Sequence, residues 1–227
     1  MRTGRLAMST VSLLLLLIAC EQQSWESAMA AGQQAMQRGQ YAEAERIFSI
    51  AVRKAEEQFG LHHRHMGVAL SNEAQALAAQ GQYVEAEPLY TQALKIYQDA
   101  HGEIHADVAA TLNNLGVLHR MHGQFSQAEP LLNRALAIKE RLHGPDHPDV
   151  ALTIHNLGLL FVSQGQPEKA EPLYRRALAI REKTLSPAHP DVVKSLEELA
   201  GVLRKLHREG EAAALDARAY ELRSKRS

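Results

Sequence analysis

Histidine is the residue type in this sequence with the clearest capacity for chemistry, because imidazole is a common ligand of zinc. The chain has 12 histidines, and His62, His63 and His65 lie close together. One ion needs ligand atoms that converge on it at about 2 Å. Further histidines follow His63 at a constant interval of 42 residues, in segments expected to be loops: His105, His147 and His189. Ligands spaced in this way cannot share an ion, so we expect no metal. The alternative is that the protein handles zinc through His62, His63 and His65.

The sequence also lacks the arrangements of nucleophiles and bases that many enzymes use. It contains no GxSxG or HExxH segment and no phosphate-binding glycine loop. Its formal net charge of −1 gives no global electrostatic reason to expect nucleic acid. We therefore predict that the protein is not an enzyme, uses no cofactor and has no nucleic-acid partner.

The chain has one cysteine, Cys20, which ends a distinctive N-terminal segment. Arg2 and Arg5 precede an apolar run, residues 11–19, which is too short to span a membrane but matches the core of a signal peptide. The run ends in LIAC, which resembles the lipobox of bacterial lipoproteins. In that family the thiol carries a diacylglycerol, and cleavage leaves the lipidated cysteine as the first residue. An ordinary secretory signal or an uncleaved anchor is the alternative.

This resemblance divides the N-terminal region into a signal peptide, residues 1–19, and a tether, residues 20–24, with its lipid on Cys20. Several acyl chains hold a protein stably on a membrane, whereas one chain binds only marginally. Glu21 follows the cysteine. In lipoproteins of enterobacterial type, a residue other than Asp there favours the outer membrane. The expected location is the bacterial cell envelope, lipid-anchored in the outer membrane and facing the periplasm. Which membrane and which leaflet stay open.

One segment, GQFSQAEPLL at residues 123–132, recurs along the rest of the chain. Related segments begin at Gly39, Gly81 and Gly165, so that each start is 42 residues from the next. Around them, a small residue followed by alanines 12 and 19 positions later occurs five times. The five sets are Gly32, Ala44 and Ala51; Ala74, Ala86 and Ala93; Gly116, Ala128 and Ala135; Gly158, Ala170 and Ala177; and Ala200, Ala212 and Ala219. The array therefore fills almost all of the chain after the N-terminal segment.

Each repeat has the pattern of two helices. Leu112, Leu115 and Leu118 follow one another at a spacing of three, which places them on one stripe of a helix. Two such helices joined at a glycine form an antiparallel hairpin. Small residues at the crossing let the two helix axes approach to about 8–10 Å. One hairpin cannot bury its own apolar face, so we predict an all-α solenoid of five stacked hairpins with a concave side.

The recurring small residues resemble those of the tetratricopeptide repeat. The period of 42 residues and the segments LNNLG, HPDV and QAEPLL are most similar to the kinesin light chain type of this repeat. The resemblance covers residues 25–223 and implies a right-handed superhelix of five helix-turn-helix units. The approximate units are 25–60, 66–102, 107–144, 149–185 and 191–223, followed by a basic tail, 224–227.

The concave side carries the residues that we expect to meet a partner. Asn72, Asn114 and Asn156 each stand two residues before the small residue of their repeat. They resemble the asparagines with which related repeats hold the backbone of an extended peptide, since an amide offers a donor and an acceptor together. The alternative is that they bond to a neighbouring helix and fix the stacking. Further groove candidates are Asn113, Arg120, His155 and Arg204.

The predicted function is that of a membrane-anchored scaffold, which binds a segment of a protein or a peptide in its groove. One alternative is a helper lipoprotein for outer-membrane assembly or secretion. The other, from a different class, is the zinc-handling protein of the envelope. The partner's identity, the choice between an extended peptide and a folded surface, and self-association stay open.

Overall fold

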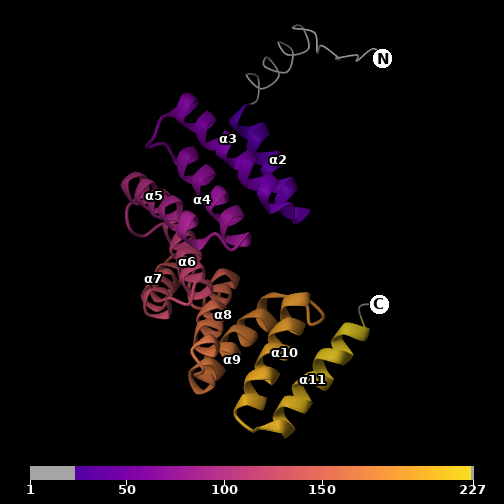
Figure 1. Cartoon of the computed structure of the whole chain (residues 1–227). Helices are drawn as coiled ribbons and strands as arrows, with labels where there is room; N and C mark the ends of the chain where they lie inside the picture. The colour runs from indigo at the N-terminus through magenta and orange to yellow at the C-terminus, as the bar shows by residue number, and fades with distance from the viewer. Residues whose placement is uncertain (1–23, 226–227) are drawn as a thin grey trace, which may run out of the picture.

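The computed structural model describes residues 24–225, which form ten α-helices in antiparallel pairs (Figure 1). Residues 1–23, which include Cys20, and residues 226–227 lie outside the described part of the chain. The helices are α2 (Trp25–Gln37), α3 (Tyr41–Phe59), α4 (Arg64–Ala79), α5 (Tyr83–His101), α6 (Ala106–Met121), α7 (Phe125–His143), α8 (Pro148–Ser163), α9 (Pro167–Thr184), α10 (Pro190–Lys205) and α11 (Glu209–Ser224).

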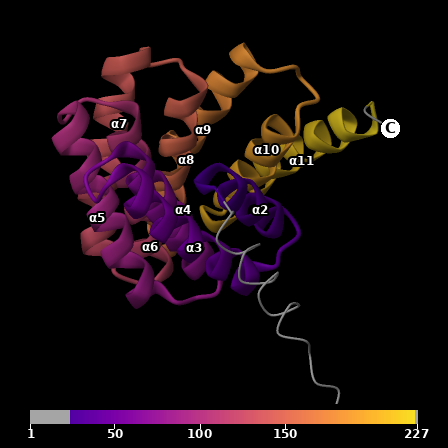
Figure 2. The ribbon, with the colours of Figure 1, turned by 90° about the horizontal axis from the view of Figure 1, so that it is seen from above.

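The five pairs stack in chain order into a right-handed α-solenoid, which confirms the fold class predicted from the repeat. Each helix packs against the next one along the chain. The first helices of neighbouring pairs also meet, α4 with α6 and α6 with α8. Figure 2 shows these three helices on the inner side of the curve, with α5 and α7 on the outer side. The concave surface is therefore made from first helices.

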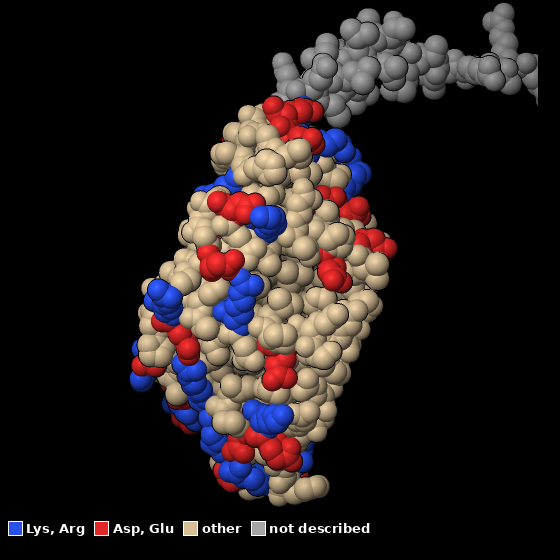
Figure 3. Space-filling view, turned by 90° about the vertical axis from the view of Figure 1, so that its left-hand side faces the viewer, with Lys and Arg blue, Asp and Glu red and all other residues tan. Residues whose placement is uncertain are grey.

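The outer surface of the stack is charged with both signs. Figure 3 shows lysines, arginines and acidic residues interspersed over the side that α5 and α7 occupy in Figure 1. Charges on neighbouring second helices also pair, as Arg176 does with Glu140 at 2.6 Å. Within residues 24–225, none of the helices is long and apolar enough to cross a membrane.

The first helices of the last four repeats begin in the same way. In each case a histidine accepts, through Nδ1, a hydrogen bond of 3.2 Å from the backbone N–H two residues later. The four capping residues are His63, His105, His147 and His189. Such an acceptor satisfies one of the N–H groups that the first turn of a helix leaves unpaired. Helix capping therefore accounts for the regular spacing of these histidines.

The turn inside each hairpin holds a residue with positive φ. In the first four repeats this residue is a glycine, with φ between 70° and 79°: Gly39, Gly81, Gly123 and Gly165. In the fifth repeat His207 takes the position, with φ at 57°. Glycine adopts this conformation freely, whereas a side chain strains it. The last hairpin is therefore less well suited to its turn than the other four.

The two helices of a hairpin touch at the small residue. A Cβ atom on Gly116 would lie 2.6 Å from Cγ of Leu132 and 3.3 Å from the backbone oxygen of Ala128. A Cβ atom on Gly158 would lie 3.0 Å from the ring of Tyr174, and Gly32 faces Phe48 in the same way. The alanines of the crossings are completely buried: Ala44, Ala74, Ala86, Ala128, Ala170, Ala200 and Ala212. The close approach leaves no space for a larger side chain.

One core position departs from the repeat. In the last three repeats, the residue before the small residue is a buried leucine: Leu115, Leu157 and Leu199. Glu73 takes this position in the second repeat. Burial and then the carboxylate of Glu45 raise the pKa of Glu73 to about 7, although Arg53 opposes them. The contact between the first and second repeats therefore disfavours the charged form of this side chain.

The crossing predicts that a glycine-to-alanine substitution changes stability in opposite directions at Gly116 and Gly201. Gly116→Ala should destabilise the fold by about 1–3 kcal/mol, because the new methyl group collides with Leu132. Gly201→Ala is the matched control in α10, where nothing lies within 4 Å of the Cβ position. It should stabilise the fold by about 0.5–1 kcal/mol, since alanine loses less backbone freedom in a helix. Urea unfolding measures both, and effects of the same sign would contradict the steric role of Gly116.

The raised pKa of Glu73 predicts that the stability of the fold depends on pH. Its folded pKa is raised from 4.5 to about 7, so the folded state binds a proton more tightly than the unfolded state. Stability should therefore fall as pH rises from about 4.5 to about 7, by at most about 3 kcal/mol. Glu73→Gln should remove this loss, so that it stabilises the protein at pH 8 and much less at pH 5. Urea unfolding at both pH values tests this, with the exposed Glu85→Gln as control. If Glu73→Gln stabilised the protein equally at pH 5 and pH 8, this prediction would be disproved.

Candidate functional site

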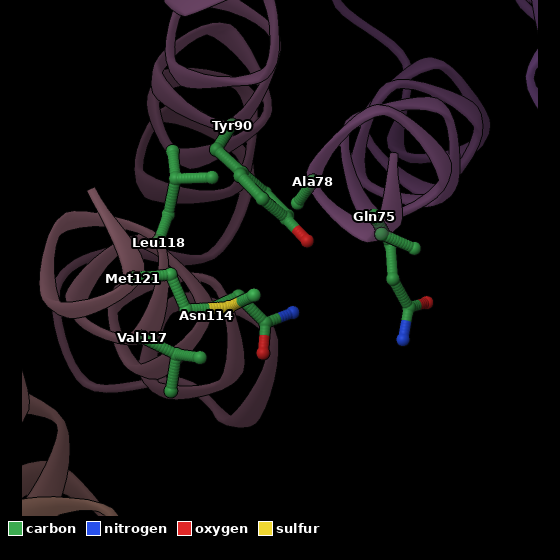
Figure 4. Close-up of a pocket in the computed structure, with 8 residues that line it drawn as sticks. Gln75, Ala78, Tyr90, Asn114, Val117, Leu118 and Met121 are labelled. Carbon is green, nitrogen blue, oxygen red and sulfur yellow. The ribbon is translucent and has the colours of Figure 1, made fainter. Parts of the chain in front are cut away.

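Two hollows lie on the concave surface, and Asn114 of α6 lines both of them. The first lies between α4 and α6 and has a volume of about 240 Å³. Its lining residues are Gln75, Ala78, Ala79, Tyr90, Asn114, Val117, Leu118 and Met121. Figure 4 shows the hydroxyl of Tyr90 and the amide of Asn114 directed into the space between the two helices. The hollow thus combines mainly apolar walls with a few polar groups.

The second hollow is lined by α6, α7 and α8, has a volume of about 310 Å³ and is more polar. Its lining includes Lys139, Asp107 and Asp149 beside the two asparagines of α6. Lys139 is 8% exposed and donates a hydrogen bond to the backbone oxygen of Asp149 at 3.3 Å. Burial lowers the pKa of Lys139, and Asp149 opposes that shift. A partner that follows the groove would therefore meet charges of both signs here.

Two side-chain bonds join successive first helices at equivalent positions. Nδ2 of Asn156 on α8 donates to Oδ1 of Asn113 on α6 at 2.9 Å. One repeat later, Nε2 of His155 on α8 lies 2.6 Å from Oε2 of Glu198 on α10. Each pair is separated by 43 residues. We call these two bonds the inter-repeat ladder. Through them, Asn113, Asn156 and His155 join neighbouring repeats.

The ladder stops before it reaches Asn114. The residue that would face Asn114 one repeat earlier is Ser71, and no hydrogen bond joins the two side chains. Asn114 accepts a long bond of 3.5 Å from Nδ2 of Asn113, and within residues 24–225 its own Nδ2 has no partner. Asn72 is different again, since it donates to the backbone oxygen of Val68 in its own helix at 2.8 Å. Of the four predicted groove asparagines, Asn114 is the one whose Nδ2 has no partner in the described part of the chain.

The two candidate arginines also differ. Arg204 pairs with Asp216 of its own hairpin. The side chain of Arg120 forms no ion pair or hydrogen bond within residues 24–225, and its Nε is completely shielded from solvent. Burial lowers the pKa of Arg120, and the hydroxyl groups of Tyr174 and Tyr83 oppose that shift. An unpaired cation therefore stands on α6, the helix that also carries Asn114.

A combination of possible metal ligands occurs at a place that the sequence analysis missed. In the described part of the chain, the ligand atoms of His101, His105 and Asp107 lie within 4.8 Å of one another. The spacing His-x3-His-x-Asp was the available signal. These residues could hold a divalent ion, but His105 already caps α6 and Asp107 already pairs with Arg64 at 3.2 Å.

The histidines first considered for zinc form no such group among residues 24–225. His63 caps α4, and its ring stacks on that of His65 with 4.8 Å between centroids. The ring of Trp25 packs against His65 with 4.2 Å between centroids. These two histidines therefore belong to an aromatic cluster that closes the start of the array.

The repeat matches the sequence profile of a known family. The profile of the tetratricopeptide repeat matches residues 23–99, 65–141, 107–183 and 163–225. The chain belongs to the tetratricopeptide repeat family. The overlapping matches cover all five hairpins, so the whole described array is built from tetratricopeptide repeats. No curated protein matches the chain significantly in sequence.

Solved tetratricopeptide structures resemble most of the chain. BtubC (BKLC) from P. vanneervenii is 27% identical, with a TM-score of 0.76, over 88% of this chain and 80% of that one. The TPR-like repeats of a kinesin light chain from Podosopora anserina are 25% identical, with a TM-score of 0.74, over 89% and 96%. A Rap protein complexed with Competence and Sporulation Factor shares the fold alone, at 17% identity and a TM-score of 0.75, over 88% and 54%. The predicted resemblance to kinesin light chain repeats is confirmed.

Proposed function

We propose that this tetratricopeptide repeat protein is a scaffold, which binds an extended segment of a partner protein along its concave surface. Membership of the family supports a role in protein–protein interaction. The observation that carries the proposal is the free Nδ2 donor of Asn114 at the border of the two hollows. An amide can donate to a backbone carbonyl and accept from a backbone N–H, so it can bind main chain of any sequence.

The ladder ends beside this amide. Asn156 holds Asn113, and Nδ2 of Asn113 lies 3.5 Å from Oδ1 of Asn114, at the long limit of a hydrogen bond. This contact engages the oxygen of the Asn114 amide and leaves its Nδ2 available. Its Nδ2 is the group that a peptide carbonyl would meet.

The size of the first hollow favours a side chain over a drug-sized ligand. Its volume of about 240 Å³ lies below the range of about 300–1,000 Å³ that is usual for small-molecule pockets. Apolar atoms of Val117, Met121 and Ala78 line it, so an apolar side chain of the partner would fill it. The fold offers a precedent, since a Rap conjugation gene regulator, 18% identical to this chain, was solved in complex with the Phr peptide.

We also propose that the scaffold is lipid-anchored through Cys20 in the bacterial cell envelope, at the outer membrane and facing the periplasm. The lipobox-like residues before Cys20 support this proposal. The first helix begins at Trp25, so a tether of a few residues would hold the array close to the membrane. In this arrangement the anchor sets the location and the groove recruits the partner.

The groove predicts that Asn114→Ala weakens capture of the partner without unfolding the chain. Affinity purification from detergent-solubilised membranes should recover a partner with wild type and about tenfold less with Asn114→Ala, since a lost hydrogen bond to a desolvated group costs about 1–3 kcal/mol. Asn133→Ala on the exposed side of α7 is the matched control and should bind as wild type does.

Asn156→Ala separates the structural role from the binding role. It should lower the melting temperature, because it leaves Oδ1 of the buried Asn113 without its partner. Asn114→Ala should leave the melting temperature nearly unchanged. Equal capture by wild type and Asn114→Ala would place binding elsewhere and refute the groove proposal. A captured component of the outer-membrane assembly or secretion machinery would identify the chain as a helper lipoprotein.

The anchor predicts a change of fractionation. In bacteria that express the full chain, wild type should sediment with membranes and incorporate labelled palmitate. Cys20→Ser should lose the label and appear in the soluble fraction. Membrane recovery of an unlabelled wild-type chain would show that the anchor is not a lipid.

A further inference from the structure

The segment that joins the first two repeats differs in charge from the segments that join the later ones. It reads GLHHRH, residues 60–65, and we call it the first inter-repeat loop. In each later repeat an acid stands two residues after the capping histidine: Asp107, Asp149 and Asp191. Here that position holds His65, and the loop contains one arginine, three histidines and no acid. This loop is therefore the one best suited to an anionic surface.

The loop also carries apolar side chains to the surface. Leu61 is 48% exposed. Beside it, the half-buried Phe59 packs edge to face against Trp25, with 6.1 Å between ring centroids. Tryptophan is enriched where proteins meet the boundary between lipid and water. An exposed leucine next to an aromatic pair and basic residues is a combination that suits the headgroup region of a bilayer.

The first inter-repeat loop lies where the chain enters the array. Trp25 begins α2 and contacts both Phe59 at the end of α3 and His65 in the first turn of α4 (Figure 1). Trp25 follows Cys20 by five residues. Even fully extended, these residues span at most about 18 Å. A lipid on Cys20 would therefore keep the loop close to the bilayer.

We propose that the first inter-repeat loop rests on the phospholipid bilayer that holds the anchor. Leu61 enters the boundary between headgroups and acyl chains, while His62 and Arg64 contact the phosphates. This inference rests on the proposed lipid anchor and adds a second point of contact to it. Nε of Arg64 pairs with Asp107 at 3.2 Å, but the arginine side chain is still 56% exposed and its terminal nitrogens can donate to a phosphate.

The short tether makes such a small contact sufficient. One leucine and a few polar groups would not hold a free protein on a membrane. A tethered loop meets the bilayer at a high effective concentration, so a weak contact is formed most of the time. Two points of contact also orient the array. The loop and the start of α2 lie at one edge of the first hairpin, so its turn at Gly39 would point away from the bilayer.

Trp25 is the single tryptophan of the chain, so its fluorescence reports on this contact alone. Wild type is purified from membranes and reconstituted into vesicles of phosphatidylethanolamine and phosphatidylglycerol, with or without bromine on the acyl chains near the headgroups. Bromine quenches tryptophan only at short range. The brominated vesicles should lower the fluorescence of wild type at least about twofold, because the tether keeps the loop on the bilayer.

Leu61→Asp should abolish most of this quenching, since it places a charge at the boundary with the acyl chains. His62→Glu should weaken the quenching, since it repels the phosphates. The matched control is Val84→Asp, which changes a side chain that is 66% exposed near the start of α5, at the edge that holds the hairpin turns. It should be quenched as wild type is. All three should melt within about 2 °C of wild type, because each changed side chain is exposed.

The outcomes separate this inference from the anchor on which it rests. If wild type carries palmitate but is not quenched, or if Leu61→Asp and His62→Glu are quenched as strongly as Val84→Asp, the contact is disproved and the anchor survives. If wild type carries no palmitate, the anchor fails. The dependence of quenching on Leu61 then still decides whether the loop touches the bilayer.

Discussion

The close crossing of two helices at a small residue is the contact on which the rest of the structure depends. At Gly116 the two helices of the third hairpin approach until a methyl group would overlap Leu132. This approach fixes the angle within the hairpin but leaves apolar surface on both helices. The next hairpin must cover that surface, and since every hairpin has the same crossing, each is added with the same rotation. The curve and its concave surface follow from this repetition.

The concave face of the first helices is the part of each repeat that the crossing does not constrain. Polar residues can therefore differ there from repeat to repeat without disturbing the stack. Asn113 with Asn156 and His155 with Glu198 use this freedom to tie neighbouring repeats together. At Ser71 the same position carries a short side chain, and the tie to Asn114 is missing. A surface that is mostly used for stacking thus keeps the Nδ2 donor of one amide available.

The fold could be predicted from the sequence because the same spacing of small residues occurs in every repeat. Five copies of one spacing identify Gly116 and Ala128 as crossing residues even where single positions vary, as at Asp216. The roles of the asparagines could not be predicted in this way, because Asn72, Asn114 and Asn156 occupy equivalent positions. What separates them is the residue 43 positions earlier on the neighbouring helix, and only the stacked geometry brings the two together. The capping role of the regularly spaced histidines likewise required the dihedral angles of the loops.

Two polar side chains on α6 have groups without a partner in the described part of the chain: Nδ2 of Asn114 and Nε of Arg120. α6 belongs to the third of five hairpins, so hairpins support it on both sides and neither of its neighbours is an end of the stack. Its bond from Asn113 to Asn156 fixes it against the following repeat. A helix held in this way can carry a free amide donor at Asn114 and an unpaired cation at Arg120 without losing its place. The end repeats have no such support, and in the last of them the equivalent arginine is neutralised within its own hairpin. A repeat that is held from both sides can therefore leave polar groups unsatisfied for a partner.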